Sequence, residues 1–241
     1  MLAVLRVYAE PGTQEKLQPI VQAAVALTIV EPISVTETAT FRGSGMFIHN
    51  PGKPPLKECA EFVLTNAHVI SDVYMDGTMK GSINAEWRTF KGGIATGTHT
   101  EKATVVFADK YVDLALIRLM RPDCEQTIRP VRLLAPEHVL GVPDDVWYVS
   151  AVEGKVEGLT LCKGNVSRHE IGDDGQESLG ISCPVKGGQS GGGVFKYNPD
   201  TTRFELGACT RQTTVEHEYV NYGIPVHLIA TFLEEAFGEV K

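Results

Sequence analysis

Short apolar segments rich in Val, Ile, Leu, Thr and Phe alternate along most of the chain with turns rich in Gly, Pro, Asn and Asp. Segments of this length, bounded by such turn residues, are typical of β-strands. The pattern predicts strands at residues 25–30, 39–48, 61–70, 103–108, 114–119, 145–152, 159–168, 192–198, 203–211 and 218–226.

Two segments are predicted to be helical. Residues 13–24 begin with a possible capping residue, Thr13, although Pro19 disfavours a helix there. Residues 227–237 carry apolar side chains at helical spacing. Many short strands and one terminal helix predict an antiparallel all-β fold. Segments 49–58 and 170–178 are expected to be exposed loops, and residues after 119 are expected to connect two halves.

The composition is that of an ordinary globular protein. Hydrophobic residues make up 43% of the 241 residues and charged residues 22%, so a sizeable core can be buried. A net charge of −8 argues against a broad interaction with nucleic acid. The apolar run 23–30 is too short to cross a bilayer, and residues 1–8 do not resemble a signal peptide. We therefore expect neither a nucleic-acid nor a membrane partner.

The five cysteines are Cys59, Cys124, Cys162, Cys183 and Cys209. Their odd number and the absence of a CxxC pair argue against a disulfide framework and a zinc site. We expect free thiols and a reducing, cytoplasmic location. Cys183 and Cys209 flank the same region, and the sequence leaves open whether they approach each other.

Ser190 lies in the glycine-rich stretch "VKGGQSGGGVF", which contains the pattern GxSxG. No helix is predicted after this serine, which argues against the nucleophile turn of an α/β-hydrolase. No GK[ST] follows the glycines, so a phosphate-binding loop is poorly supported. A plain glycine-rich turn and a nucleophile loop remain open from this stretch alone.

A serine nucleophile needs a base, and the base needs a group that orients it. His68 follows the apolar run "FVLT", and Asp113 directly precedes the apolar segment "LALIRL". Alone, the histidine could be a core residue and the aspartate a turn residue. Together with Ser190 they occur in the order His, Asp, Ser, which is the chain order of one known catalytic triad.

These motifs resemble those of trypsin-like serine proteases with the chymotrypsin fold, most closely the HtrA (Deg) branch. The segments that carry the resemblance, in order, are "GSGMFI", "FVLTNAHVI", "VDLALIRL", "GNVSR", "GGQSGGGVF" and "NYGIPV". The resemblance spans roughly residues 25 to 235. Two residues depart from the family pattern: Gln189 stands where the HtrA branch has Asn, and Gly193 replaces the usual proline.

The resemblance implies one peptidase domain, 1–241, made of two six-stranded antiparallel β-barrels and a C-terminal helix. The first barrel, within 1–122, would carry His68 and Asp113, and the second, within 123–241, would carry Ser190. Ser190 would be the nucleophile, His68 the base and Asp113 its orienting group. The backbone N–H groups of Gly188 and Ser190 would form the oxyanion hole.

The resemblance also implies a pocket for the substrate's P1 side chain. Its walls would comprise Pro184, Val185, Lys186, Gly187, Thr210, Arg211, Gln212, Val220 and Tyr222. Pro184 occupies the position of the aspartate that binds Arg or Lys in trypsin. Without that carboxylate, a basic P1 residue lacks a partner, and we expect a small or medium apolar P1 residue.

The function predicted from the sequence is a serine endopeptidase that acts through an acyl-enzyme. It would act on a protein or peptide substrate, with no cofactor or metal and with a possible regulatory protein partner. The alternatives are a catalytically silent member of the same fold that binds proteins, and an esterase with a hydrolase fold. An intact triad disfavours the first, and the missing helix after Ser190 disfavours the second.

Overall fold

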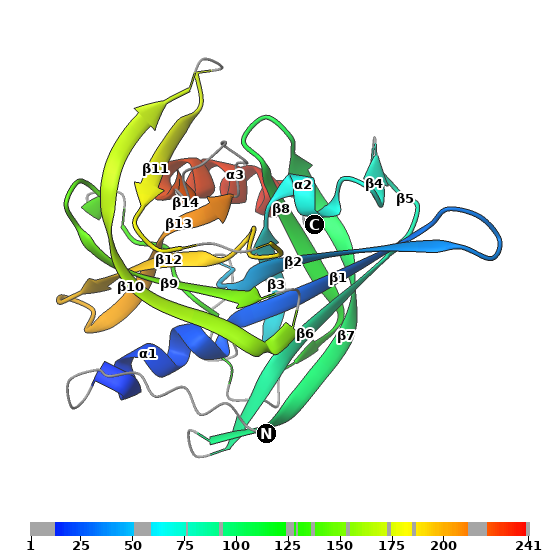
Figure 1. The fold of residues 1–241 in the computed structure, drawn as a ribbon, viewed down its shortest axis with the longest axis horizontal. Helices are drawn as coiled ribbons and strands as arrows, with labels where there is room; N and C mark the ends of the chain where they lie inside the picture. The colour runs from blue at the N-terminus through cyan, green and yellow to red at the C-terminus, as the bar shows by residue number, and fades with distance from the viewer. Residues whose placement is uncertain are drawn as a thin grey trace.

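The computed structural model of the chain describes residues 13–50, 59–75, 77–91, 94–123, 128, 130–135, 138–152, 155–172, 175–184, 187–211 and 221–239. Its strands form two closed six-stranded antiparallel barrels, which confirms the predicted fold class (Figure 1). Helices α1 (Thr13–Gln22) and α3 (Val226–Glu239) lie outside the barrels, and the four-residue helix α2 (Ala67–Ile70) follows a strand of the first.

The first barrel is built from strands early in the chain. It has the closed order β1-β2-β3-β8-β7-β6. These strands are β1 (Ala24–Pro32), β2 (Thr38–Ile48), β3 (Ala60–Thr65), β6 (Ser82–Lys91), β7 (Ile94–Asp109) and β8 (Leu114–Asp123), with a separate two-stranded ribbon of β4 (Tyr74–Met75) and β5 (Thr78–Met79).

The second barrel follows with the closed order β10-β11-β14-β13-β12-β9. Its strands are β9 (Asp145–Val152), β10 (Lys155–Ile171), β11 (Glu177–Ile181), β12 (Gly193–Asn198), β13 (Arg203–Arg211) and β14 (Asn221–Pro225). The predicted loop 170–178 is instead the hairpin end that joins β10 to β11. Segment 49–58, predicted to be a loop, lies outside the described residues.

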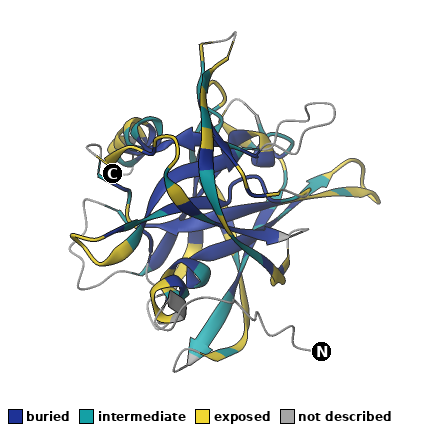
Figure 2. Ribbon diagram, turned by 60° about the vertical axis from the view of Figure 1, so that its left-hand side comes forward, coloured by how far each residue is buried: buried dark blue, intermediate teal, exposed yellow. Residues whose placement is uncertain are grey.

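The core follows from alternation along the strands, since successive side chains of a strand point to opposite faces. In β6, for example, Ile83, Ala85 and Trp87 are fully buried while the residues between them are partly exposed. The ring of Trp87 meets the edge of Phe47 from β2, with centroids 5.2 Å apart. Figure 2 shows buried residues at the centre of the molecule and exposed residues at the tips of the long hairpins.

Two segments tie the barrels together. Helix α3 leaves β14 of the second barrel and packs on the first, where Phe237 contacts Phe62 and Phe232 contacts Phe107. The connecting segment around residues 131–134 forms backbone bridges to both barrels, pairing Val131 with Ile48 and Leu133 with Leu206. The relative placement of the barrels is therefore set by packing on both sides of their junction.

Candidate active site

His68 lies on α2 rather than on the strand predicted for residues 61–70. Strand β3 ends at Thr65, and Asn66 keeps an extended backbone before the helical turn begins. Ala67, Val69 and Ile70 are buried, whereas 46% of the His68 side chain is exposed. The turn therefore keeps its apolar residues in the core and presents the imidazole at the surface.

Asp113 lies in the turn between β7 and β8 and orients His68. Its Oδ2 is 2.8 Å from Nδ1 of the imidazole, and its Oδ1 accepts the backbone N–H of His68 at 2.9 Å. Because a carboxylate only accepts hydrogen bonds, Nδ1 must carry the proton, which leaves Nε2 with its lone pair. The pair has the geometry of a base and its orienting group.

The backbone of Asp113 is in the left-handed region, with φ of 62°, which aspartate tolerates better than most residues. Asn66 fixes this turn by donating its side-chain N–H to the Asp113 carbonyl at 3.0 Å. Asn66 was not singled out from the sequence, although it lies within the quoted histidine motif. Its buried amide joins the end of β3 to the aspartate turn.

Ser190 lies in a tight loop that leads into β12. Gly188 and Gly191 on either side have positive φ values of 80° and 89°, which favour glycine. The N–H of Gly191 donates to the Thr210 carbonyl at 2.9 Å, and the N–H of Thr210 returns to the Gly192 carbonyl at 2.8 Å. The glycines thus fix the conformation of the loop rather than making it flexible.

Ser44 of β2 joins the serine loop to the first barrel. Its N–H donates to the Ser190 carbonyl at 2.8 Å. Its hydroxyl lies 3.0 Å from the carbonyls of both Gly188 and Ala151, and its one proton can be donated to either. The same hydroxyl is 3.1 Å from the backbone nitrogen of Ala151, so it can accept that N–H. A single buried side chain therefore connects both barrels at the nucleophile.

Thr65 brings the serine loop close to the histidine segment. Its hydroxyl donates to the Ser44 carbonyl at 2.7 Å. A side chain at Gly191 would collide with both that carbonyl and the Thr65 hydroxyl. Gly191 directly follows Ser190, and Thr65 precedes His68 by three residues, so this contact joins the serine loop to the end of β3. Among the described residues, the Ser190 hydroxyl makes no hydrogen bond to the imidazole of His68, whose side-chain partner is Asp113.

The predicted oxyanion donors are available. Among the described residues, neither the N–H of Gly188 nor that of Ser190 donates a hydrogen bond to another protein group. The positive φ of Gly188 sets the direction of the peptide groups that precede Ser190. Unpaired backbone N–H groups near a serine hydroxyl can stabilise an oxyanion, and the role of Gly188 and Ser190 as its donors stays a prediction.

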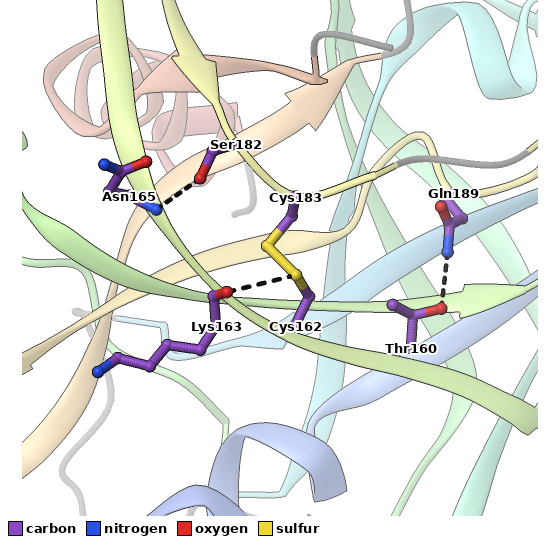
Figure 3. The surroundings of a disulfide bond; sticks show 7 residues. All are labelled: Thr160, Cys162, Lys163, Asn165, Ser182, Cys183 and Gln189. Atoms are coloured by element: carbon purple, nitrogen blue, oxygen red, sulfur yellow. Dashed lines mark hydrogen bonds between the residues drawn. A yellow bond between two sulfur atoms is a disulfide. The ribbon is translucent and has the colours of Figure 1, made fainter.

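A disulfide anchors the segment before the serine loop (Figure 3). Cys162 on β10 is bonded to Cys183, with a Cα–Cα distance of 6.1 Å, and Cys59 is also disulfide-bonded. The prediction of free thiols was therefore wrong for these residues, because cysteine number and spacing carry no signal for this pair. Disulfides persist mainly in oxidising compartments, so the predicted cytoplasmic location no longer has free thiols as support.

Gln189 holds the same segment to β10 by a second contact. Its side-chain N–H donates to the Thr160 hydroxyl at 2.8 Å, as Figure 3 shows. The residue is buried, and its carbonyl accepts the Tyr148 hydroxyl at 3.4 Å. Burial raises the pKa of Tyr148 to about 12, so this hydroxyl stays a donor at neutral pH. Gln189 is thus a structural anchor of the loop.

The glycine at position 193 is explained by side-chain packing. A Cβ at this position would run into the ring of Phe195 and into Leu206, both fully buried. The glycine therefore leaves space for an aromatic side chain of β12 itself. The proline that usually follows this motif would not fit that arrangement.

Cys209 is the free buried cysteine among the described residues. Burial, followed by the nearby charge of Asp113, raises the pKa of its thiol well above the usual range. Its Sγ accepts a weak hydrogen bond from Asn66 at 3.9 Å. A thiol that stays protonated is a poor nucleophile, in agreement with the choice of Ser190.

The predicted substrate-binding residues lie in several places. Pro184 and Gly187 are exposed beside the serine loop, and Thr210 is buried beneath it. Arg211 and Tyr222 pair across β13 and β14, where Arg211 donates to Ser178 and Tyr222 accepts from Arg168, both at 2.7 Å. The remaining predicted residues, Val185, Lys186, Gln212 and Val220, lie outside the described residues.

Two further observations bear on partners. Among the described residues, no group of three His, Cys, Asp or Glu side chains is arranged to hold a metal ion. None of the described helices is both long enough and apolar enough to span a membrane.

Comparison with known families agrees with this geometry. Residues 43–199 match the family described as a trypsin-like peptidase domain, which is more than half of the chain and includes the segments around His68, Asp113 and Ser190. No curated protein matches the sequence.

Proposed function

We propose that this chain, which belongs to the trypsin-like peptidase family, is a serine endopeptidase whose catalytic residues are His68, Asp113 and Ser190. The observation that carries the proposal is the 2.8 Å contact between His68 and Asp113, placed next to a glycine-walled serine loop. Only the peptidase family follows from the match; the proposed roles of the three residues are supported by the His68–Asp113 contact and by their order in the chain. We also propose that it belongs to the HtrA branch, whose sequence motifs it resembles.

Acylation would use two proton transfers, and it forms one covalent bond and breaks another. Ser190 Oγ attacks the carbonyl carbon of the substrate's scissile peptide bond, while His68 Nε2 takes the hydroxyl proton. The electron pair of the carbonyl moves to its oxygen, where the N–H groups of Gly188 and Ser190 stabilise the negative charge. The imidazolium then gives its proton to the leaving amine, and the peptide bond breaks.

Deacylation would repeat the same steps with water. His68 takes a proton from the water as its oxygen attacks the acyl carbon, and returns the proton to Ser190 Oγ as the ester bond breaks. Asp113 stays ionised throughout and stabilises the charged imidazole. His68 passes the Ser190 proton to the leaving amine and the water proton to Ser190, so the protons balance over the cycle without a cofactor.

The proposal for the substrate concerns the charge of its P1 side chain. Pro184 and Gly187 lie beside the serine loop and offer no carboxylate to a basic P1 side chain. We therefore propose that Lys and Arg are poor P1 residues for this enzyme, because a buried cation without a partner is costly.

The test is cleavage of natural proteins. A cell lysate is incubated with the wild-type protein or with Ser190→Ala, and new N-termini are identified by mass spectrometry. We expect new N-termini with the wild type alone. The same set with both proteins, or none with either, would count against the endopeptidase and favour a silent fold that only binds proteins.

A further inference from the structure

The turn that carries Asp113 joins β7 to β8 in the first barrel. The backbone of Asp113 has a φ of 62°, which is strained for a residue with a side chain, although aspartate tolerates it better than most. A strained conformation persists only where the surrounding structure fixes it. The contacts that fix this turn therefore also fix the carboxylate that orients His68.

Two side chains fix the turn from within the first barrel. Asp109 Oδ1 accepts the backbone N–H groups of Tyr111 at 2.7 Å and of Val112 at 3.1 Å. The side chain of Asn66 donates to the Asp113 carbonyl at 3.0 Å. The carbonyl of Tyr111, two residues before Asp113, accepts a hydrogen bond from outside this barrel.

Gln176 of the second barrel donates that hydrogen bond. It directly precedes β11 in the β10–β11 hairpin, and its side-chain Nε2 donates to the Tyr111 carbonyl. The two residues are 65 positions apart in the sequence and belong to different barrels. This contact therefore connects the aspartate turn to the barrel that carries Ser190.

The orientation of the Gln176 amide is fixed by its other partner. Its Oε1 accepts Nη1 of Arg211 from β13, and Nη2 of Arg211 donates to Ser178 Oγ at 2.7 Å. Because a guanidinium only donates hydrogen bonds, the amide oxygen must face Arg211 and the amide N–H groups must face Tyr111. The backbone carbonyl of Gln176 also accepts the N–H of Gly172 at 2.8 Å, which closes the hairpin.

On the basis of the proposed endopeptidase function, we propose that Gln176 is a positioning residue, which keeps the Asp113 carboxylate against His68 by fixing the Tyr111 carbonyl. Without this hydrogen bond the strained turn relaxes, and the carboxylate moves away from Nδ1 of the imidazole. A displacement of about 1 Å is enough to slow an enzymatic reaction about 100-fold. The second barrel would then supply the nucleophile and also fix the geometry of the base in the first barrel.

The experiment replaces the donor of this hydrogen bond and keeps its acceptor. In Gln176→Glu the side-chain shape and the pairing with Arg211 are retained, but a carboxylate cannot donate to the Tyr111 carbonyl. We expect kcat for peptide cleavage to fall about 10- to 100-fold, with KM and the melting temperature nearly unchanged.

A second measurement needs no turnover. The proton between His68 Nδ1 and Asp113 should give a low-field proton NMR signal in protein with isotope-labelled histidine, because this hydrogen bond is short and charge-assisted. We expect the signal in the wild type and its loss in Gln176→Glu, since a displaced carboxylate lets the proton exchange with water.

Glu170 provides a matched control in the same hairpin. Its Oε1 lies 2.8 Å from Nε of Arg168 in a half-exposed ion pair on β10. Glu170→Gln also exchanges a carboxylate and an amide, but away from the aspartate turn. It should leave kcat, KM and the NMR signal of His68 unchanged.

The outcomes separate this proposal from the endopeptidase proposal. If Gln176→Glu keeps both kcat and the NMR signal, the positioning role is wrong while the endopeptidase stands. If kcat falls together with the melting temperature and the NMR signal stays, Gln176 is structural and the positioning role is wrong. If the wild type cleaves no peptide, the endopeptidase proposal fails, and the NMR comparison alone decides the role of Gln176: loss of the signal in the variant supports it, and an unchanged signal contradicts it.

Discussion

His68 and Asp113 of the first barrel are fixed by hydrogen bonds to each other, whereas Ser190 of the second barrel is fixed by contacts that other residues make with its loop. The histidine–aspartate pair makes three contacts of 2.8, 2.9 and 3.0 Å within one barrel. The serine loop is instead fixed by Ser44, Thr210 and a disulfide, which reach it from three different strands and the preceding segment. The first half of the site therefore depends on side-chain chemistry, and the second on backbone conformation and on anchors around it.

Removing the charge of Asp113 tests the histidine–aspartate pair, and it should have the largest effect on activity. In Asp113→Asn the side-chain shape and the tolerance for positive φ are retained, but the carboxylate that stabilises the imidazolium is lost. We expect kcat for peptide cleavage to fall by about 10⁴-fold with little change in melting temperature.

Asp109 is the matched control for that variant. It lies in the same turn and accepts the backbone N–H of Tyr111 at 2.7 Å rather than contacting the imidazole. Asp109→Asn should keep kcat within a few-fold of wild type. A similar loss of kcat in both variants would mean that the turn, and not the charge on Asp113, controls activity.

Adding a methyl group at Gly191 tests whether backbone conformation and packing fix the serine loop. Gly191→Ala is strained by its φ of 89° and collides with Ser44 and Thr65. We expect the free energy of unfolding, measured by urea denaturation, to fall by about 2–4 kcal/mol. Gly187→Ala, where a Cβ meets open space, should change it by less than about 0.5 kcal/mol. Equal stability of the two variants would contradict the packed contact between the barrels.

Removing the disulfide tests the anchor before the loop. Because its cysteines are 21 positions apart in the sequence, the bond is expected to contribute about 3 kcal/mol by limiting the unfolded chain. Cys162→Ser with Cys183→Ser should lower the urea midpoint accordingly and slow peptide cleavage. If the midpoint of the double variant equals that of the oxidised wild type, the bond does not stabilise the fold.

The Ser44 hydroxyl should have the smallest effect of the four. Ser44→Ala leaves the carbonyl of Gly188 and the N–H of Ala151 without this partner, at a cost of about 1–3 kcal/mol in the free energy of unfolding. We also expect slower acylation. Ser167→Ala removes a single hydroxyl bond within the β10–β11 hairpin and should leave acylation unchanged. Equal acylation rates would show that Ser44 does not support the loop.

The same contrast explains what could be predicted from the sequence. His68, Asp113 and Ser190 could be proposed as site residues because each lies in a short local motif and the three follow a known order. Most strands of both barrels were predicted where apolar side chains run together, as at Leu114–Leu119. Strand β11 (Glu177–Ile181) was missed, and its first two residues were assigned to the predicted loop 170–178. Strand β6 was missed, although Ile83, Ala85 and Trp87 alternate with polar residues, because its charged residues masked the pattern.

The anchors of Ser190 could not be predicted, because they join residues that are distant in sequence. Ser44 and Gly188 are 144 positions apart, and the sequence around either residue does not predict its contact with the other. The Cys162–Cys183 bond was missed because an odd number of cysteines does not say which ones pair. The turn at His68 was missed because "AHVI" is as apolar as the strand before it, and only the core packing decides where the strand ends.

The central claim is that Ser190 is the activated nucleophile of the site. It is tested most directly by intact-mass spectrometry after treatment with a fluorophosphonate, which reacts with activated serines. We expect one adduct per chain, located on Ser190 by peptide mapping and absent from Ser190→Ala. An adduct that persists in Ser190→Ala, or a wild-type protein that stays unmodified while its fold is intact, would contradict the claim.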